Sequence, residues 1–452
     1  MSKLLIEFGF RIKPNITLKM KVNKVSIGIF LLISVTVFGQ SKSQKNSPAL
    51  TEATPESVGM SSERLQRIDN VFQQAINKNE LPGISALVVR NGKIVYFKAF
   101  GMADNQANKT LKRDDIFRIA SMSKAITSTA VMMLWEEGKF YLDDPISKYI
   151  PEFKNPTVLK SFSFSDSSYT TEPAKSEITI RHLLTHTSGL GYGVIDGDER
   201  FKAMYKKAGI IDLYTTEPVK IGDNIKKLAK LPLHHNPGEK YTYSEGLDVL
   251  GYFIEIMSGM TFEEFLRKKM FEPLGMSDTY FYLPDAKKDR LVAIQKPEKD
   301  KWVRFPVTFY DPEYPVKGAK TFYSGGAGLS SSAKDYATFL QMYLNGGELG
   351  GKRFLSRTTI DVILSNQVGD LMGGANGNSF YGLAFGVLKA SGAAKGGLGS
   401  EGSFEWGGYF NTNYFADPKE RIIGILMKQT QQNTGDSYAN MFRQLIYQSI
   451  DD

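Results

Sequence analysis

The hydrophobic pattern that opens the main body of the chain predicts a helix followed by a two-stranded hairpin. Over residues 61–79 apolar positions recur three and four residues apart, which is the spacing of an amphipathic helix. Two apolar runs follow at residues 83–90 and 93–100, joined by Asn91-Gly92. This dipeptide is typical of a tight hairpin turn. We therefore expect an antiparallel sheet to begin here.

The middle of the chain is predicted to be mainly helical, and strand patterns return only near its end. Residues 121 to about 345 carry mostly helical spacing, interrupted by loops such as the Ser/Thr-rich stretch Ser161 to Ser176. A final amphipathic segment over residues 437–450 is predicted to pack on the sheet. The late segments with strand patterns are residues 381–388, 410–416 and 421–427.

Both ends of the chain are therefore expected to contribute to one sheet, which predicts an α+β fold: an antiparallel sheet flanked by helices, with a mainly helical lobe inserted. No Pro-rich, Gly/Ser-repeat or charge-block linker divides the body. We expect one domain over residues 56–452 with two interleaved lobes. The sheet lobe takes about 56–120 and 346–452, and the helical lobe takes about 121–345.

The N-terminal residues have a different character. Three lysines precede the apolar run Val25 to Phe38, and Val37-Phe38-Gly39 supplies residues of the kind that a signal peptidase recognises. The sequence predicts a signal peptide over residues 1–40 and a disordered lead-in over residues 41–55. We expect export to the periplasm or the extracellular space. The run is short for a membrane span. An uncleaved signal that anchors the protein in the membrane is the alternative that stays open.

Charge and cysteine content exclude several classes of function. The chain carries a formal charge of +8, of which residues 1–40 supply +5 through six bases and one acid. The remaining +3 is too mild to indicate nucleic acid binding, and no basic stripe is interleaved with aromatic residues. The chain contains no cysteine, which excludes disulfides and thiolate metal sites.

Ser121 and Lys124 are the first candidates for chemistry. Positions three apart on a helix share a face, so the Lys124 amine can reach the Ser121 hydroxyl and serve as its base. The spacing alone is a weak signal, because Ser331 begins a second match. Ser121, however, opens an apolar helix over residues 125–134, where the helix dipole favours a developing oxyanion. Ser331 follows a glycine-rich turn and is predicted to N-cap the helix containing residues 335–344.

Tyr243 is a candidate for the proton shuttle that a serine-lysine pair still requires. A phenol close to a lysine ammonium ionises more readily than its reference pKa of about 10, which suits a general acid or base. The alternative is a core tyrosine whose hydroxyl simply has a hydrogen-bond partner.

Six motifs follow one another between about Glu56 and Ile450. They are Ser121-Met122-Ser123-Lys124, Thr179 to Leu190, Pro237-Gly238 leading to Tyr243-Ser244, Pro273-Leu274-Gly275-Met276, Gly325 to Leu329, and Phe404-Glu405-Trp406-Gly407-Gly408 before Asp417-Pro418. In this order they resemble the β-lactamase-related serine hydrolases, which include class C β-lactamases, D-amino acid carboxypeptidases and their esterase relatives. The resemblance implies a β-lactamase/transpeptidase-like fold, as in penicillin-binding proteins.

The resemblance also implies roles for particular residues. It implies Ser121 as the nucleophile, Lys124 as its activating base and Tyr243 as the proton shuttle. The oxyanion would be held by the backbone N–H groups of Ser121 and Tyr409, the residue after Gly408.

Two departures from the family pattern concern the substrate. The second motif is usually Tyr-x-Asn, but here a carboxylate, Glu245, replaces the amide that contacts a substrate acylamide. The third motif is Lys-Thr-Gly or His-x-Gly in lactamases and peptidases, but here it is Trp406-Gly407-Gly408. Its glycines still let the backbone approach an acyl carbonyl, yet a cation that would bind a substrate carboxylate is lost. The loss costs on the order of 1.5 to 3 kcal/mol for lactams and peptides and nothing for neutral esters.

We therefore expect an exported serine hydrolase that acts through an acyl-enzyme on Ser121, as a carboxylesterase or acyl transferase on small acyl esters and without a cofactor. Trp406, Gly407, Gly408, Tyr409 and Glu245 are expected to bind the substrate. Two alternatives stay open: a D-Ala-D-Ala-type peptidase or class C-like β-lactamase acting on a cell-wall-type peptide or a lactam, and a non-catalytic exported ligand-binding protein. The oligomeric state is not indicated.

Other constellations are disfavoured. His182 and His186 stand four apart like paired zinc ligands, and His234-His235 could complete a site. No Glu follows His182, however, and Thr179 predicts a structural helix start, so we expect no metal. No Gly-x-Ser-x-Gly occurs, and four histidines offer little for an α/β-hydrolase triad. By analogy with the family, residues 161–176 and 196–224 are expected to roof the pocket.

Overall fold

The computed structural model describes residues 7–12, 16–21, 47–374, 376–396, 399–433 and 437–452. The chain divides into two units, Met1–Gln40 and Ser41–Asp452. In the first unit, β1 (Glu7–Ile12) and β2 (Ile16–Lys21) form an antiparallel hairpin. The apolar run of the predicted signal peptide lies outside the described residues. Within the described ranges, no helix has the length and apolar character needed to cross a membrane.

One large sheet forms the centre of the second unit, in the order β15-β16-β17-β18-β19-β4-β5-β3, with β6 (Lys109–Thr110) paired to β5. Neighbours are antiparallel except that β3 runs parallel to β5. The strands on the main path are β3 (Thr51–Glu52), β4 (Gly83–Arg90), β5 (Lys93–Asp104), β15 (Ser379–Tyr381), β16 (Gly386–Leu388), β17 (Phe404–Gly408), β18 (Thr412–Asp417) and β19 (Ile422–Met427). Because β19 pairs with β4, both ends of the chain share one sheet, as the pattern predicted.

The hairpin between β4 and β5 has the predicted turn. Asn91 and Gly92 have φ angles of 51° and 74°. Two successive positive φ angles are what a type I′ turn requires, and asparagine and glycine tolerate them best.

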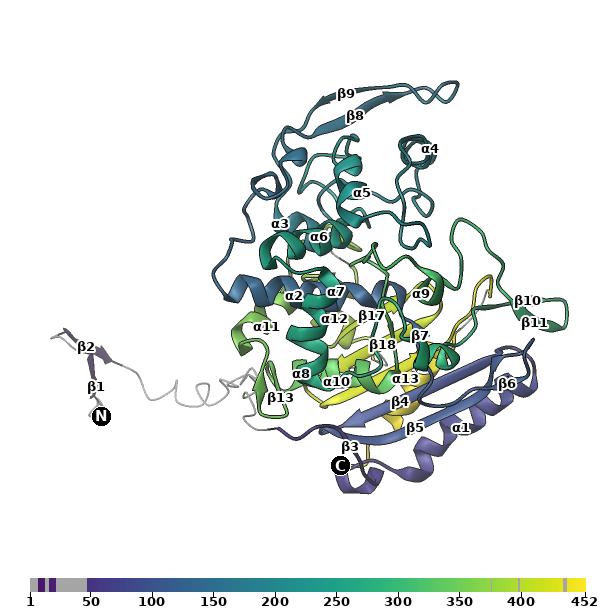
Figure 1. Cartoon of the computed structure of the whole chain (residues 1–452). Coiled ribbons are helices and arrows are strands. Elements are labelled where there is room, and N and C mark those ends of the chain that lie inside the picture. Colours follow the sequence, from purple (N-terminus) through teal and green to yellow (C-terminus); the bar gives the residue numbers. More distant parts are fainter. Residues whose placement is uncertain (1–6, 13–15, 22–46, 375, 397–398, 434–436) are drawn as a thin grey trace. The chain divides into compact units, whose positions relative to one another are not determined.

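Helices cover both faces of the sheet (Figure 1). On one face α1 (Ser62–Asn77) and α13 (Tyr438–Gln448) lie together, and Phe72 and Phe442 pack in the same hydrophobic cluster. On the other face α10 (Ala333–Leu344) packs against β19 and β4. Beyond it lies α2 (Ser123–Glu136), which is buried along most of its length. This buried helix is the one that the apolar run after Ser121 predicted.

The inserted lobe is mainly helical, as expected. Its further helices are α3 (Ile180–Leu184), α4 (Glu199–Ala208), α5 (Ile221–Leu228), α6 (Gly246–Ser258), α7 (Phe262–Leu266), α8 (Glu272–Leu274) and α9 (Tyr314–Lys317). Two short helices follow near the end of the chain: α11 (Arg357–Leu364) and α12 (Ala390–Ala393). Short strand pairs connect these elements: β7 (Phe117–Arg118) with β12 (Ser330–Ser331), β10 (Gln295–Glu298) with β11 (Lys301–Arg304), and β13 (Glu348–Leu349) with β14 (Lys352–Arg353).

The stretch Ser161 to Ser176 is not the loop that was predicted. It contributes to an antiparallel hairpin of β8 (Thr157–Phe162) and β9 (Tyr169–Pro173). All five residues of β9 are exposed, so neither face shows the apolar alternation by which a strand is recognised.

Three other details differ from the predictions. Ser332, not Ser331, caps α10, because the Ser332 hydroxyl accepts the Asp335 N–H at 3.2 Å. The predicted strand over 381–388 is two strands, because the Gly382 N–H donates to the Phe385 carbonyl in a tight turn. The disordered lead-in does not extend over residues 47–55. There β3 joins the sheet, and the Ser47 hydroxyl donates to the Glu348 carboxylate at 2.7 Å.

Candidate active site

Ser121 lies in a single 3-10 turn, Ala120–Met122, that leads directly into α2. Lys124 follows in the first turn of that helix. Its Nζ lies 3.3 Å from Ser121 Oγ, so the spacing of three residues does bring the amine to the hydroxyl. Ala120, just before the serine, has a φ of 43°, in the left-handed region that residues with a Cβ adopt rarely. The chain therefore enters the helix through a sharp turn whose apex holds Ser121.

The Lys124 side chain is fully buried. Its Nζ donates to the Gly326 carbonyl at 2.8 Å and lies 4.5 Å from the centre of the Tyr243 ring and 5.7 Å from that of Tyr192. A buried ammonium group is costly unless acceptors and π faces compensate for the lost water. These contacts fix the amine beside the serine.

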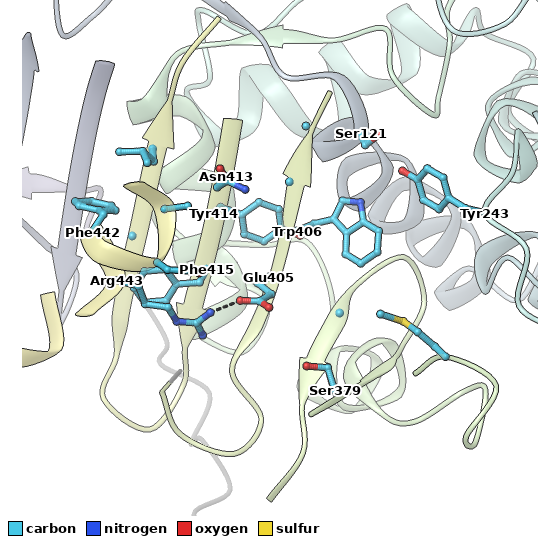
Figure 2. A pocket seen from close by; sticks show the side chains of 18 residues that line it. Ser121, Tyr243, Ser379, Glu405, Trp406, Asn413, Tyr414, Phe415, Phe442 and Arg443 are labelled. Atoms are coloured by element: carbon cyan, nitrogen blue, oxygen red, sulfur yellow. Dashed lines mark hydrogen bonds and ion pairs between the residues drawn. The ribbon is translucent and has the colours of Figure 1, made fainter. Parts of the chain in front are cut away.

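Tyr243 lies beside the serine-lysine pair. Figure 2 shows its hydroxyl turned toward Ser121. The His186 ring packs 4.5 Å from the Tyr243 ring, and His186 Nδ1 accepts the Ser244 N–H at 3.2 Å. Burial, and then the charge of Lys124, hold the pKa of His186 well below its usual value. The phenol therefore rests against a neutral imidazole, and the three candidate side chains from distant parts of the sequence converge.

The end of β17 approaches the serine turn closely. A Cβ built on Gly408 would lie 2.5 Å from the Ile119 carbonyl oxygen, so only glycine lets the strand come this near. Tyr409, the predicted second oxyanion donor, follows directly after this approach. Its side chain is 37% exposed. The oxyanion role of its N–H stays a prediction.

A cavity of about 490 Å³ opens beside Ser121 and wraps the edge of β17 (Figure 2). Ser121, Tyr243, Trp406, Gly407 and Gly408 all line it. In the described sheet β16 pairs only with the first two residues of β17, which leaves the remaining three as a free edge. Such an edge offers backbone donors and acceptors to an extended substrate. Neither of the loops expected to roof the pocket, 161–176 or 196–224, contributes a lining residue.

Glu245 is not the substrate contact that was predicted. It is 1% exposed and does not line the cavity. Burial, and then the neighbouring Asp212, raise the pKa of the Glu245 carboxyl well above its usual value. Glu245 is the N-cap residue of α6 and its side chain is buried in the protein interior, which residue identity alone does not show.

Arg443 is a lining residue that the sequence interpretation missed. It is 6% exposed, it pairs with the Glu405 carboxylate, and its guanidinium lies 4.5 Å above the Phe415 ring. Its Nε has no hydrogen-bond partner in the described part of the chain. The sequence feature that could have indicated this role is the position of Arg443, a cation between the apolar residues of the last helix. The cavity therefore does contain a cation, although not on β17.

The histidines do not form the paired arrangement considered for zinc. α3 ends at Leu184, so His186 lies beyond the helix that carries His182. His182 Nδ1 accepts the Thr179 N–H in a capping box, as the helix-start interpretation predicted. Across the described ranges, no group of three potential ligands is placed to hold a metal ion.

Glu245→Gln is expected to make the folded protein more stable than the wild type at about pH 8, with the advantage shrinking near pH 5. In the folded wild type Glu245 keeps its proton, because its pKa is raised. In the unfolded chain it releases that proton as the pH rises past 4.5, the ordinary pKa of a glutamate carboxyl. The carboxyl's stabilising contribution is thus complete below that pH and is lost as the pH rises. Glutamine does not titrate. Urea unfolding at both pH values measures this, and a pH-independent difference between the two proteins contradicts it.

A family model described as Beta-lactamase matches residues 68–448 of this chain. Esterase EstB from Burkholderia gladioli is 32% identical over 386 residues, which cover 80% of this chain and 90% of the esterase. A putative D-alanyl-D-alanine carboxypeptidase from Escherichia coli O157:H7 is 28% identical, over 79% of this chain and 82% of its own length.

Among solved structures, EstCE1, a hydrolase with promiscuous acyltransferase activity, superposes with a TM-score of 0.73 at 26% identity. The match covers 85% of this chain and 99% of EstCE1. This likeness confirms the fold class that the six motifs implied.

Proposed function

Because the chain belongs to the β-lactamase family of serine hydrolases, we propose that it is a carboxylesterase or acyl transferase that works through an acyl-enzyme on Ser121. One observation carries the proposal. The Lys124 amine lies 3.3 Å from the Ser121 hydroxyl, with the Tyr243 ring packed on the same amine, at the mouth of the cavity. This arrangement supplies a nucleophile, a base and a proton donor without a metal.

The reaction proceeds in two halves. Ser121 Oγ attacks the acyl carbonyl carbon while its proton passes to neutral Lys124, and the oxyanion is held by the N–H groups of Ser121 and Tyr409. The ester bond then breaks as Tyr243 gives a proton to the departing alcohol oxygen, and Lys124 returns the proton to the phenolate. Water or a second alcohol attacks the acyl-enzyme in the reverse sense, which releases an acid or a new ester.

The third motif favours esters as substrates. Trp406 occupies the place of the cation that lactamases and peptidases use, so a neutral ester loses no interaction there. The names of two similar proteins, an esterase and a hydrolase with acyltransferase activity, support this choice.

A peptidase or β-lactamase activity is the second candidate, because Arg443 lines the cavity and a similar protein is named a putative carboxypeptidase. Nitrocefin and D-Ala-D-Ala peptides, assayed beside p-nitrophenyl acetate and butyrate, separate the two candidates. We expect the esters to react faster. A lactam or peptide rate above the ester rate, lost in Arg443→Gln, reverses the ranking.

The same assays address the ligand-binding alternative, for which the wild-type protein would show no turnover of any ester. We also propose export, supported by the lysines and apolar run before residue 39. Fractionation of cells that express the full chain tests it, because recovery of the protein only in the cytoplasm contradicts export.

Tyr243→Phe is expected to slow hydrolysis of ethyl butyrate by about 10²-fold or more, and p-nitrophenyl butyrate by clearly less. Phenylalanine keeps the ring over the Lys124 ammonium but cannot protonate the leaving oxygen. An ethoxide leaving group needs that proton, whereas p-nitrophenolate leaves readily without it. Initial rates with both esters measure the contrast, and equal losses for both esters contradict a shuttle role.

A further inference from the structure

A short turn, residues 324–327, connects Lys124 to a buried carboxyl group on α6. Lys124 Nζ donates to the Gly326 carbonyl at 2.8 Å. From the opposite side Asp248 Oδ1 accepts the Gly326 N–H at 3.2 Å and the Ser324 hydroxyl at 2.5 Å. One residue of backbone therefore separates the candidate base from a carboxylate, and the turn is held from both helices.

Asp248 is packed tightly against this turn. The residue is 2% exposed, and a Cβ built on Gly326 would lie 2.5 Å from Asp248 Oδ2. In the described part of the chain Oδ2 has no hydrogen-bond partner. Lys124 is equally buried. A buried ammonium and a buried carboxylate are each costly alone, but each offsets the desolvation of the other when they lie close together.

Asp248 is the carboxyl group that lies across one residue of backbone from Lys124, whereas the buried Asp212 accepts the Gly193 and Val194 N–H groups. Tyr192 and Tyr243 present ring faces to Lys124. His186 is neutral, because burial and Lys124 lower its pKa. Burial, and then the neighbouring Asp212, raise the pKa of Glu245 well above its usual value, which favours its neutral form.

Asp248 differs from Glu245 in what surrounds its carboxyl. Burial raises the pKa of Asp248, but the Ser324 hydroxyl, Lys124 and the Gly326 N–H all favour its ionised form. The charged form of Asp248 is therefore hydrogen-bonded on the side that faces the 324–327 turn.

We propose that Asp248 is a positioning residue for the reaction, which holds Lys124 in place through the 324–327 turn and supplies the negative charge that offsets the buried ammonium. It acts through Lys124 and does not touch the substrate. The inference rests on the proposed function of Ser121 and Lys124. Its consequence is that removing the charge of Asp248 changes the pH dependence of the reaction.

Asp248→Asn tests the charge. Asparagine keeps an oxygen that can accept from Ser324 and Gly326 but removes the negative charge that offsets the buried ammonium. The acid limb of the kcat/KM profile for p-nitrophenyl butyrate is expected to move to lower pH by about one unit. An acid limb that stays in place in a variant with wild-type thermal unfolding overturns the proposal.

Ser324→Ala tests the positioning and serves as the matched control, because it keeps the charge of Asp248 and removes the two hydrogen bonds of the Ser324 hydroxyl, which donates to Asp248 Oδ1 and accepts the Ala327 N–H. We expect kcat/KM to fall about threefold to tenfold with KM unchanged, and the acid limb to move less than in Asp248→Asn. An unchanged kcat/KM overturns the proposal, and this variant also decides the matter if Asp248→Asn does not fold.

Different results would refute the proposed function and the role of Asp248. A wild-type protein without ester turnover or Ser121 acylation refutes the proposed function, and the role of Asp248 falls with it. An active wild type whose Asp248→Asn profile does not move refutes the role of Asp248 alone.

Discussion

Replacing Ser121 with alanine is expected to lower kcat/KM for p-nitrophenyl butyrate by at least about 10⁴-fold. The Lys124 amine lies 3.3 Å from the hydroxyl at the apex of the turn before α2, and Ser121 lines the same cavity as Tyr243 and the β17 edge. Without it no acyl-enzyme forms, and the remaining groups can only polarise the ester for attack by water. The unfolding temperature is expected to change little, because one partly exposed oxygen is lost.

Ser331→Ala is the matched control for this prediction. Ser331 opens the second Ser-x-x-Lys match, but it lies in β12, where its hydroxyl is 2.8 Å from that of Thr279. Its loss is expected to leave kcat/KM within a few-fold of the wild type. Substantial activity in Ser121→Ala, or an equal loss in both variants, contradicts the assignment of the nucleophile.

Lys124→Met is expected to lower kcat/KM by about 10³-fold. Methionine fills much of the same buried space but cannot accept the Ser121 proton. It also leaves the buried Asp248 carboxylate without the ammonium that offsets its charge, so the unfolding temperature is expected to fall as well. Rates are therefore compared at a temperature at which both proteins are folded, where a lost rate reports the missing base and not unfolding.

Lys334→Met provides the control, because Lys334 stands at the same spacing in the second match and is exposed. Its activity is expected to equal that of the wild type. A Lys124→Met protein that keeps a tenth or more of the wild-type rate contradicts the role of Lys124 as the base.

Features carried by local sequence were predictable. The Asn91-Gly92 hairpin, the helix after residue 61 and the last helix each depend on residues close together in the chain, and the structure confirms them. The approach of Lys124 to Ser121 was predictable for the same reason, since it needs only one turn of helix. The assembly of both chain ends into one sheet followed from where the strand patterns occur.

Features set by tertiary packing were not predictable. The sequence shows Glu245 beside Tyr243, but only the fold reveals that its side chain points inward toward Asp212. Arg443 and Asp248 each lie on helices whose apolar spacing indicates packing, so their part in the site depends on contacts with remote residues. The hairpin of β8 and β9 was missed because its second strand, β9, is exposed along its whole length and lacks an apolar face.

The most direct measurement is mass spectrometry of the intact protein mixed with p-nitrophenyl butyrate and quenched with acid within one turnover, followed by peptide mapping. The account predicts one butyryl group per chain, carried by the peptide that contains Ser121, and none in Ser121→Ala. Rapid ester turnover with no butyryl group on that peptide, or with the group on another side chain, would contradict it.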